Sequence, residues 1–436
     1  MTFFLGIKGA GMAALACMLY ERGEHVEGSD LEKHFFTEEK LKQYNIKCHP
    51  FGVFPEDGST VIIGNAFKED NEDVKVIRSN PSYKVYRYHE FLGELLKDYH
   101  GVAITGSHGK TTTTKMMTSL LSVYKPTAYL IGDGHGHLTK DSHYCVIEAD
   151  EYRRFFLSYF PEYAVITNVD YDHVDYYKDE KDYALAYEQF ALNVSKAIFV
   201  YGDDPEIKKL DLKTKAHVYT YGLEKGNDLF ANILTENEHE TIFELSFLNE
   251  YLGIVRIPFS GRHLLWNALG CIGVGLLEKM PLALIEEGLG QFENASRRFK
   301  VEVNGPNVYI DDYAHHPTEV SVTIDAARLR YPNHRLVAIF KPHRVSRLYH
   351  FADAFAKALD KADDVYLCGF SAIDDQEAGY DITIDYLKER SQKAIVIEEN
   401  EKGAEILNSL APAVYLFMSS KDIYGLANLL KAYQKH

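Results

Sequence analysis

The chain has 436 residues, a formal net charge of −17 and five cysteines. This length is too great for one ordinary hydrophobic core and predicts roughly two to four domains. The acidic balance excludes a nucleic-acid partner, because proteins bind phosphate backbones through an excess of Lys and Arg. The cysteines are scattered and form no CxxC pair, so we expect free thiols in a reducing compartment. No segment has the length of a membrane span or the pattern of a signal peptide, and we expect a cytoplasmic protein without membrane insertion.

Apolar runs alternate with helical patterns in three successive segments. In the first, strands are predicted at 2–5, 25–28 and 60–64, and helices at 12–22 and 90–96. In the second, strands are predicted at 101–105, 144–148, 163–168, 197–201, 228–234 and 241–247, and helices at 111–124 and 263–277. In the third, strands are predicted at 308–311, 335–340, 364–367, 394–397 and 413–417. This alternation is typical of α/β domains with parallel sheets, and it predicts domains at 1–98, 99–296 and 297–436.

The first predicted strand runs into a glycine-rich turn that opens a helix. Amides at such a helix start are suited to a pyrophosphate, and Asp30, after the second strand, is placed to accept a ribose hydroxyl. Lys8 lies inside the turn and is expected to add positive charge to that contact. A dinucleotide such as NAD and a UDP-sugar both fit this pattern. The predicted binding residues are Gly6, Lys8, Gly9, Gly11, Met12, Ser29 and Asp30.

The strongest motif follows the strand predicted at 101–105 and precedes a helix. Gly106 and Gly109 allow a tight turn whose amides face a phosphate. Lys110 is placed to bind the β- and γ-phosphates, and the Thr111 hydroxyl to hold Mg²⁺. The spacing G-x-x-G-K-T is two residues shorter than the general phosphate-loop pattern. We predict ATP contacts from Gly106, Ser107, His108, Gly109, Lys110, Thr111 and Thr112.

Acidic and metal-binding side chains follow the neighbouring predicted strands. Glu148 ends the strand at 144–148, and His173 follows the strand at 163–168. Because parallel strands end at one edge of a sheet, both side chains are expected near the phosphate loop. Thr111, Glu148 and His173 are therefore predicted to bind Mg²⁺, with Mn²⁺ as an alternative ion.

Seven strings extend along nearly the whole chain. They are TGSHGKTTTT at 105–114, EADEYRR at 148–154, TNVDYDHVDYY at 167–177, GRH with Asn267 at 261–267, RRF at 297–299, DDYAHHP at 311–317 and KPHRVSR at 341–347. Together they resemble the Mur ligases. Those members that add L-alanine are resembled in particular by His108 of the first string, the EADE block, the DDYAHHP string and the KPHRVSR string. The resemblance implies two Rossmann-like domains flanking a central P-loop-type ATP-binding domain.

The resemblance also implies an activity: ATP-dependent joining of L-alanine to UDP-N-acetylmuramate through an acyl phosphate, in peptidoglycan precursor synthesis. The first segment would then hold the UDP group, and the chain would act as a monomer or weak homodimer. Implied catalytic residues are Lys110, Glu148, His173 and Arg298. Implied further ATP contacts are Asn267, Arg298 and Asp312, and implied substrate contacts are His315, His343, Arg344 and Arg347.

Three departures from the family pattern leave some of the implied ligand contacts open. Leu264 stands where Asn is frequent, Lys341 stands where Gln is usual, and the segment 419–421 (Ser-Ser-Lys) replaces a glycine-containing turn. The alternatives are another Mur-type ligase, which recycles a murein tripeptide or adds a different amino acid, a non-catalytic UDP-sugar-binding relative, and a dehydrogenase. Three histidines, His135, His137 and His143, lack the spacing of a zinc site.

Overall fold

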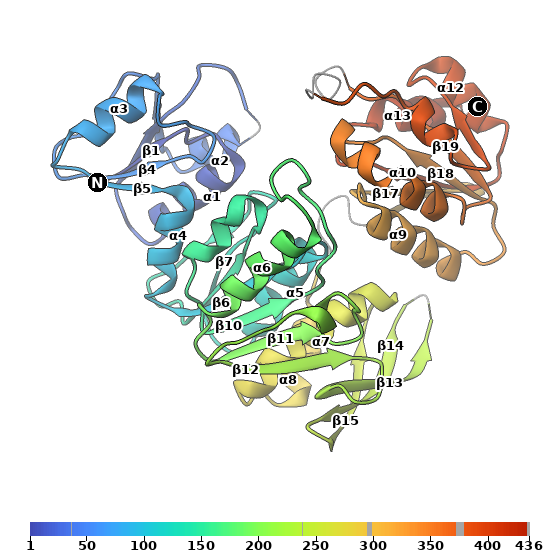
Figure 1. Cartoon of the computed structure of the whole chain (residues 1–436), viewed down its shortest axis with the longest axis horizontal. Coiled ribbons are helices and arrows are strands. Elements are labelled where there is room, and N and C mark those ends of the chain that lie inside the picture. The colour runs from blue at the N-terminus through green and yellow to red at the C-terminus, as the bar shows by residue number, and fades with distance from the viewer. Residues whose placement is uncertain (36, 238, 294–298, 372–378, 434–436) are drawn as a thin grey trace. The chain divides into compact units, whose positions relative to one another are not determined.

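The computed structural model describes residues 1–436 except 36, 238, 294–298, 372–378 and 434–436 (Figure 1). Its described strands form three sheets of five, ten and six strands. The chain divides into two compact units. The first comprises 1–171, 179–260 and 264–293, and the second comprises 172–178, 261–263 and 294–436.

The N-terminal sheet is parallel, with strand order β3-β2-β1-β4-β5. The apolar strand β1 lies at its centre and is buried along its whole length, as expected for a parallel sheet covered on both faces. Its elements are β1 (Thr2–Leu5), α1 (Ala10–Glu21), β2 (Val26–Ser29), α2 (Glu38–Gln43), β3 (Lys47–His49), β4 (Thr60–Ile63), α3 (Glu72–Ser79), β5 (Lys84–Arg87) and α4 (Tyr88–Leu96).

The ten-stranded sheet has the order β15-β14-β13-β12-β11-β10-β6-β9-β7-β8. Its elements are β6 (His100–Thr105), α5 (Lys110–Ser122), β7 (Thr127–Leu130), β8 (Gly136–His137), β9 (Tyr144–Glu148), η1 (Tyr152–Ser158), β10 (Tyr163–Ile166), α6 (Glu180–Ala191), β11 (Ala197–Tyr201), η2 (Ile207–Lys209), β12 (His217–Gly222), β13 (Leu229–Glu236), β14 (Thr241–Phe247), β15 (Glu250–Ile257), α7 (Arg262–Leu277) and α8 (Leu282–Gly290). Strands β9, β6 and β10 are adjacent and parallel, with Ile104 opposite Glu148 and Thr105 opposite Ile166. This register brings the segments after all three strands to one edge of the sheet.

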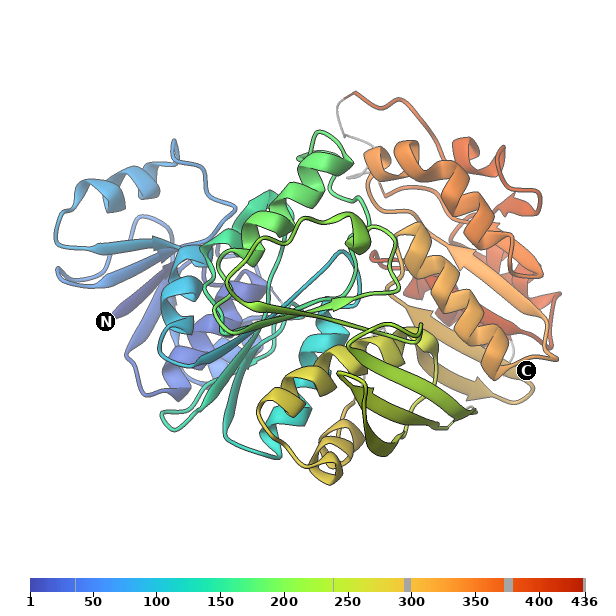
Figure 2. The same ribbon diagram turned by 60° about the horizontal axis from the view of Figure 1, so that its bottom comes forward.

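One face of the ten-stranded sheet carries a large core of the first unit. Side chains of α5, α7 and α8 pack there against the parallel strands and the β13–β15 meander. Figure 2 shows the yellow helices α7 and α8 beside these green strands. The core fixes the direction of α5, whose N-terminus follows directly from the turn after β6.

The third sheet has the order β16-β17-β21-β18-β19-β20, with only β16 antiparallel among its described strand pairs. Its elements are β16 (Lys300–Asn304), β17 (Asn307–Asp312), α9 (Pro317–Arg330), β18 (Leu336–Phe340), α10 (Val345–Leu359), β19 (Asp364–Leu367), α11 (Asp385–Lys388), β20 (Ala394–Val396), α12 (Glu401–Asn408), β21 (Val414–Met418) and α13 (Tyr424–Tyr433). Helices α9 and α10 lie side by side over one face (Figures 1 and 2). Alternate side chains of each central strand enter two separate cores, one under α9–α11 and one under α12 and α13.

The three-domain α/β architecture predicted from the sequence is confirmed. The predicted and observed bounds are identical for the strands at 144–148, 197–201, 241–247 and 364–367. Most other predicted elements agree with the structure within two residues at each end. Short or weakly apolar elements had no periodic signal strong enough to predict them, and they include β3, β5, β7, β8 and β12.

The packing of α8 on α5 gives a stability prediction. A Cβ atom on Gly288 would lie 2.6 Å from the Leu120 Cα atom, which is backbone and cannot rotate away. Gly288→Ala should therefore lower the free energy of unfolding by about 1–3 kcal/mol, measured by urea denaturation. Gly290→Ala, in the same helix with nothing within 4 Å of the new Cβ atom, is the control and should be neutral or slightly stabilising. Equal losses in the two variants would contradict this packing argument.

Candidate functional site

The turn after β6 is shaped by two glycines in the left-handed region. Gly106 has φ of +132° and Gly109 has φ of +79°. A Cβ atom on Gly106 would lie 2.1 Å from Thr167 Oγ1, and one on Gly109 would lie 3.0 Å from Asn267 Oδ1. Asn267 is buried on α7. The structure thus brings this predicted ATP contact to the loop, together with the end of β10.

Residues after β10 hold the loop in place. The Ser107 amide donates to the Asn168 carbonyl (3.2 Å), and the His108 amide donates to Asn168 Oδ1 (2.8 Å). The Ser107 hydroxyl donates to the Asp170 carbonyl at 2.6 Å, and His108 Nε2 lies 3.2 Å from the Asp170 carboxylate. These groups of Ser107 and His108 therefore brace the loop. The amides best placed for phosphate are those of the first turn of α5, which have no acceptor within the helix.

The Lys110 side chain folds back into the loop. Its Nζ donates to the carbonyls of Gly106 (2.6 Å) and Ser107 (3.2 Å) and contacts both carboxylate oxygens of Glu151 at 2.9 and 3.1 Å. Burial opposes the charged form of the amine, but the carboxylates of Glu151, Asp150 and Glu148 together outweigh burial and raise the pKa of Lys110 above its ordinary value. Lys110 is therefore a fixed cation beneath the turn.

Two of the three predicted metal ligands lie together. The Thr111 hydroxyl donates to the Glu148 carboxylate oxygens at 3.0 and 3.2 Å, and the Gly132 amide donates to the same carboxylate at 2.9 Å. A hydroxyl and a carboxylate are hard oxygen donors that suit Mg²⁺. His173 belongs to the segment 172–178 of the second unit, so its role beside this pair stays a prediction. Its φ of +52° is a strained conformation of the kind that gathers at functional sites.

The N-terminal glycine turn is tightly packed. A Cβ atom on Gly6 would lie 2.4 Å from the Phe67 ring, and one on Gly11 would lie 2.6 Å from the Tyr88 hydroxyl. Both carboxylate oxygens of Asp30 accept backbone hydrogen bonds of 2.7 Å, from the amides of Lys8 and Leu31. A contact from Asp30 to a ribose stays a prediction, as do the roles of Gly9, Met12 and Ser29.

Lys8 has protein partners of its own, and its predicted contact to a pyrophosphate stays a prediction. Its Nζ donates to the carbonyls of Leu31 (2.5 Å) and Lys33 (3.0 Å) and lies 2.5 Å from the Glu38 carboxylate. Its carbonyl accepts from the Thr37 hydroxyl at 2.5 Å. The ammonium charge is therefore matched by Glu38, and the residue ties the glycine turn to the segment after β2.

In the second unit, predicted substrate contacts gather after the parallel strands of the third sheet. His343 follows β18 and its Nδ1 lies 2.7 Å from the Ser420 hydroxyl, after β21. The His315 and His343 ring centres are 6.4 Å apart. Ser420 belongs to the segment that departs from the family pattern, so this departure touches a predicted substrate residue directly.

The two predicted substrate arginines form ion pairs with the loop 172–178. Both Arg347 Nη2 and Nε donate to the Asp172 carboxylate at 2.9–3.1 Å, and both side chains are buried. Burial alone would raise the pKa of Asp172, but the Arg347 guanidinium holds it far below its usual range. Arg344 has φ of +67° and lies 2.9 Å from the Asp175 carboxylate. Acceptance of a substrate carboxylate by these arginines stays a prediction.

Asp312 is a structural centre of the second unit. Its buried carboxylate accepts from the amides of Phe299 (2.7 Å) and Ala314 (2.8 Å) and from the Thr323 hydroxyl (3.3 Å). It therefore ties the chain entering β16 to the turn after β17, and its predicted ATP contact is untested. Arg298, predicted as a catalytic and ATP-binding residue, lies outside the described residues.

Lys341, the second departure from the family pattern, also has a structural partner. Its Nζ lies 2.8 Å from the Glu399 carboxylate and donates to the Asp422 carbonyl at 3.0 Å. The residue thus links the ends of β18 and β21. Leu264, the first departure, packs against the large core of the first unit.

Other residues considered from the sequence have separate partners. The histidines His135, His137 and His143 contact Asp133, Glu21 and Lys125, respectively. Among the described residues these three histidines therefore form no common metal site. No described helix has the length and apolarity needed to cross a membrane.

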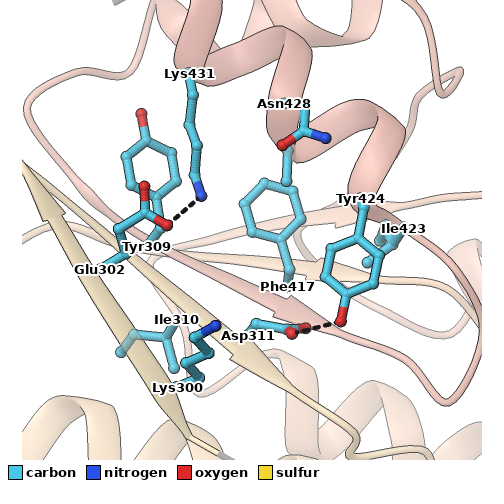
Figure 3. A pocket seen from close by; sticks show the side chains of 11 residues that line it. Lys300, Glu302, Tyr309, Ile310, Asp311, Phe417, Ile423, Tyr424, Asn428 and Lys431 are labelled. Carbon is cyan, nitrogen blue, oxygen red and sulfur yellow. Dashed lines mark hydrogen bonds and ion pairs between the residues drawn. The ribbon is translucent and has the colours of Figure 1, made fainter. Parts of the chain in front are cut away.

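A small pocket lies between α13 and the sheet strands β16, β17 and β21 (Figure 3). Its volume is about 80 Å³, too small for a nucleotide. Three of its charged side chains have protein partners: Lys431 Nζ lies 2.7 Å from Glu302, and the Tyr424 hydroxyl donates to Asp311 at 3.1 Å. We assign this pocket no ligand.

The structure adds residues that the sequence pattern did not single out. Glu151 and Tyr183 are buried beside Lys110 and Ser107, and Thr167 and Asn168 brace the loop. The position of Glu151, Thr167 and Asn168 in the EADE and TNVD strings was their only signal, and Tyr183 on α6 lies outside both strings. Side chains that follow β9 and β10 meet those of α6 at the loop only in the folded protein.

Comparison with protein-family models gives three matches. The model described as the Mur ligase family catalytic domain matches residues 3–100, the Mur ligase middle domain matches 104–275, and the Mur ligase glutamate ligase domain matches 297–421. The matches follow one another along nearly the whole chain and include each of the three sheets.

Solved structures of the same kind resemble the chain over its whole length. The UDP-N-acetylmuramate–alanine ligase of Thermotoga maritima is 25% identical, with a TM-score of 0.75 over 100% of this chain and 99% of that one. A murein peptide ligase of Psychrobacter arcticus is 20% identical, with a TM-score of 0.69 over 99% and 98%. The MurF ligase of Thermotoga maritima, solved with ADP, is 17% identical, with a TM-score of 0.66 over 95% and 96%.

The Lys8 contacts predict a pH-dependent stability. Hydrogen bonds from Lys8 and Lys42 lower the pKa of Glu38 from 4.5 to about 2. A carboxylate with a lowered pKa stabilises the fold above its ordinary pKa, and this contribution is lost as the pH falls towards 2. Lys8→Met should therefore destabilise the protein at about pH 7, and by less at about pH 3, in urea unfolding experiments.

Lys42→Met is the matched control, because Lys42 also contacts Glu38, at 3.0 Å, but is 69% exposed. An exposed pair contributes little, so this variant should lose clearly less stability than Lys8→Met. Two results would show that the buried Lys8–Glu38 pair does not stabilise the turn. One is an equal loss of unfolding free energy in both variants, and the other is a loss in Lys8→Met that is the same at both pH values.

Proposed function

The chain belongs to the Mur ligase family, whose members are ATP-dependent amide ligases, and from this premise we propose that it joins L-alanine to UDP-N-acetylmuramate. The observation that carries the proposal is the loop after β6, where Lys110, the Thr111–Glu148 pair and Asn267 surround one glycine turn. Such a turn at a helix start is suited to a nucleoside triphosphate. The product would be a peptidoglycan precursor made in the cytoplasm.

Each of the three segments would bind a different ligand. Residues 1–98 would hold the UDP group at the glycine turn after β1, residues 99–296 would bind ATP, and residues 297–436 would bind the amino acid. The support for this division is that each segment has its own sheet with parallel central strands, and candidate residues follow the carboxyl ends of those strands.

A carboxylate must be activated before it can form an amide with an amine at neutral pH. In the proposed reaction, the substrate carboxylate oxygen attacks the γ-phosphorus of ATP, and ADP leaves. The amine of L-alanine then attacks the carbonyl of the acyl phosphate, and phosphate leaves as the amide forms. Lys110 would stabilise the charge that develops on the transferred phosphoryl group. Mg²⁺, bound through Thr111 and Glu148, would supply further positive charge.

The choice of L-alanine rests on the segments after β17 and β18. The DDYAHHP string places His315 there, and the KPHRVSR string supplies His343, Arg344 and Arg347. Arg suits recognition of a carboxylate, because its planar fork can donate two parallel hydrogen bonds. Release of an arginine from Asp172 or Asp175 would make it available to the amino acid.

A second candidate is a ligase that adds a preformed peptide. It is favoured by the full-length likeness to a murein peptide ligase and by Ser420, whose hydroxyl contacts His343. A changed contact at this position would alter the shape of the amino-acid pocket. The two candidates share the ATP chemistry and differ only in the amine that they accept.

Substrate-dependent ADP release separates the two candidates. The purified protein, given ATP, Mg²⁺ and UDP-N-acetylmuramate, should release ADP with L-alanine and not with D-glutamate or a tripeptide that begins with L-alanine. Glycine should be accepted weakly, because a missing methyl group is worth only about 1–3 kcal/mol. Release with the tripeptide alone would select the peptide ligase, and release with none of the amines would refute both.

Lys110→Ala tests the catalytic loop. This variant should lose roughly 100-fold or more of the ADP release rate, since it removes the cation at the phosphate loop. Its circular dichroism spectrum should match that of the unmodified protein. Lys196→Ala, which removes a half-exposed lysine at the opposite ends of the strands, should keep full activity. A Lys110→Ala protein with undiminished turnover would place the triphosphate elsewhere.

A further inference from the structure

Glu151 is a fully buried carboxylate with no assigned role in the proposed reaction. It follows β9 by three residues, and its exposed fraction is 0%. Both of its carboxylate oxygens contact the Lys110 ammonium, at 2.9 and 3.1 Å. A buried carboxylate of this kind is stable only next to a cation, because removing a lone charge from water costs several kcal/mol.

The same carboxylate is linked to the other side of the loop. The Tyr183 hydroxyl, on α6, lies 3.4 Å from Glu151 Oε1 and 2.7 Å from the Ser107 hydroxyl. Tyr183 is itself buried and contacts the Tyr187 hydroxyl at 3.1 Å. Glu151 thus anchors Lys110 directly and lies beside the phenol that contacts Ser107, so its position is set by the surrounding fold.

A triphosphate and Glu151 offer the same thing to Lys110, namely anionic oxygens. The three N–H groups of the ammonium donate hydrogen bonds to Glu151 and to the carbonyls of Gly106 and Ser107. Binding to the β- and γ-phosphates requires at least one of those hydrogen bonds to be given up. The carboxylate and the nucleotide therefore compete for one cation.

We propose that Glu151 is a positioning residue that holds the Lys110 ammonium in the loop before ATP binds, and that ATP binds by displacing this carboxylate from the lysine. The loop is then kept charged and ordered without nucleotide, at the expense of some nucleotide affinity. This inference rests on the ATP-binding part of the proposed function and is independent of the identity of the amine substrate.

The test is nucleotide binding by Glu151→Gln, measured by calorimetry with ATP and Mg²⁺ and without UDP-sugar or amino acid. The amide keeps the size of the side chain but removes the charge that competes with the phosphates. We expect the Kd for ATP to fall by about 3- to 10-fold. Without nucleotide the melting temperature should fall, since Lys110 loses its counter-charge, and ATP should raise it by more than in the unmodified protein.

Asp150→Asn is the matched control, because it removes the same charge from the exposed neighbouring residue. Its Kd should fall by clearly less than that of Glu151→Gln, because Asp150 acts on the Lys110 ammonium only through space and its exposed charge is screened. Glu151→Asp, which keeps the charge and withdraws it by one methylene group, should fall between Glu151→Gln and the unmodified protein. It also provides a measurable variant if Glu151→Gln fails to fold.

A purely structural Glu151 would lower the melting temperature on substitution and leave ATP affinity unchanged or weaker, and that result would overturn the inference. An equal tightening in Asp150→Asn would overturn it too, because the effect would then be one of overall charge. The proposed function has a separate outcome. A protein that binds ATP but releases no ADP with any amine would contradict the ligase proposal and leave the Glu151 comparison intact.

Discussion

The candidate site depends on one electrostatic constraint, the burial of the Lys110 ammonium beneath the turn after β6. A buried cation must be matched by anions and carbonyls, and the structure supplies both from the loop itself and from Glu151 after β9. Parallel strands make this possible because β9, β6 and β10 end at the same edge of the sheet. Asn168 and Asp170, after β10, hold the other side of the turn. The loop is thus held in one conformation by contacts to its own backbone and to the segments after the neighbouring strands.

Contacts of this kind recur in the other two sheets with different residues. In the N-terminal sheet, Lys8 and Asp30 tie the glycine turn to the segment after β2. In the third sheet, Asp312 ties the turn after β17 to the chain before β16 through the amides of Ala314 and Phe299. In each case a charged side chain that resembles a ligand-binding residue satisfies backbone groups of its own loop. Residues of this kind fix the conformation of the loops that line a site. To contact a ligand as well, their side chains would need a further hydrogen-bond donor or acceptor that the loop does not use.

Local patterns in the sequence were sufficient to predict the fold and the residues that surround the turn after β6. The apolar runs of β9 and β11 and the glycine spacing of the phosphate loop are signals contained within a few residues, and Thr111 and Glu148 meet as predicted from the edge rule for parallel strands. Glu151 could not be separated from its neighbours in EADE, because its burial depends on α6 and the loop. The role of Lys8 was likewise hidden, since its partner Glu38 lies thirty positions away along the chain. Pairings between distant segments leave no periodic trace in a single sequence.

The central claim is that a nucleoside triphosphate binds across the turn between β6 and α5, and a crystal structure with a non-hydrolysable ATP analogue and Mg²⁺ tests it most directly. The account predicts phosphate oxygens on the amides at the start of α5, Lys110 Nζ within hydrogen-bond distance of them, and the metal between Thr111 and Glu148. A structure in which the analogue lies elsewhere, while Lys110 keeps all its contacts to Glu151, Gly106 and Ser107, would contradict the account.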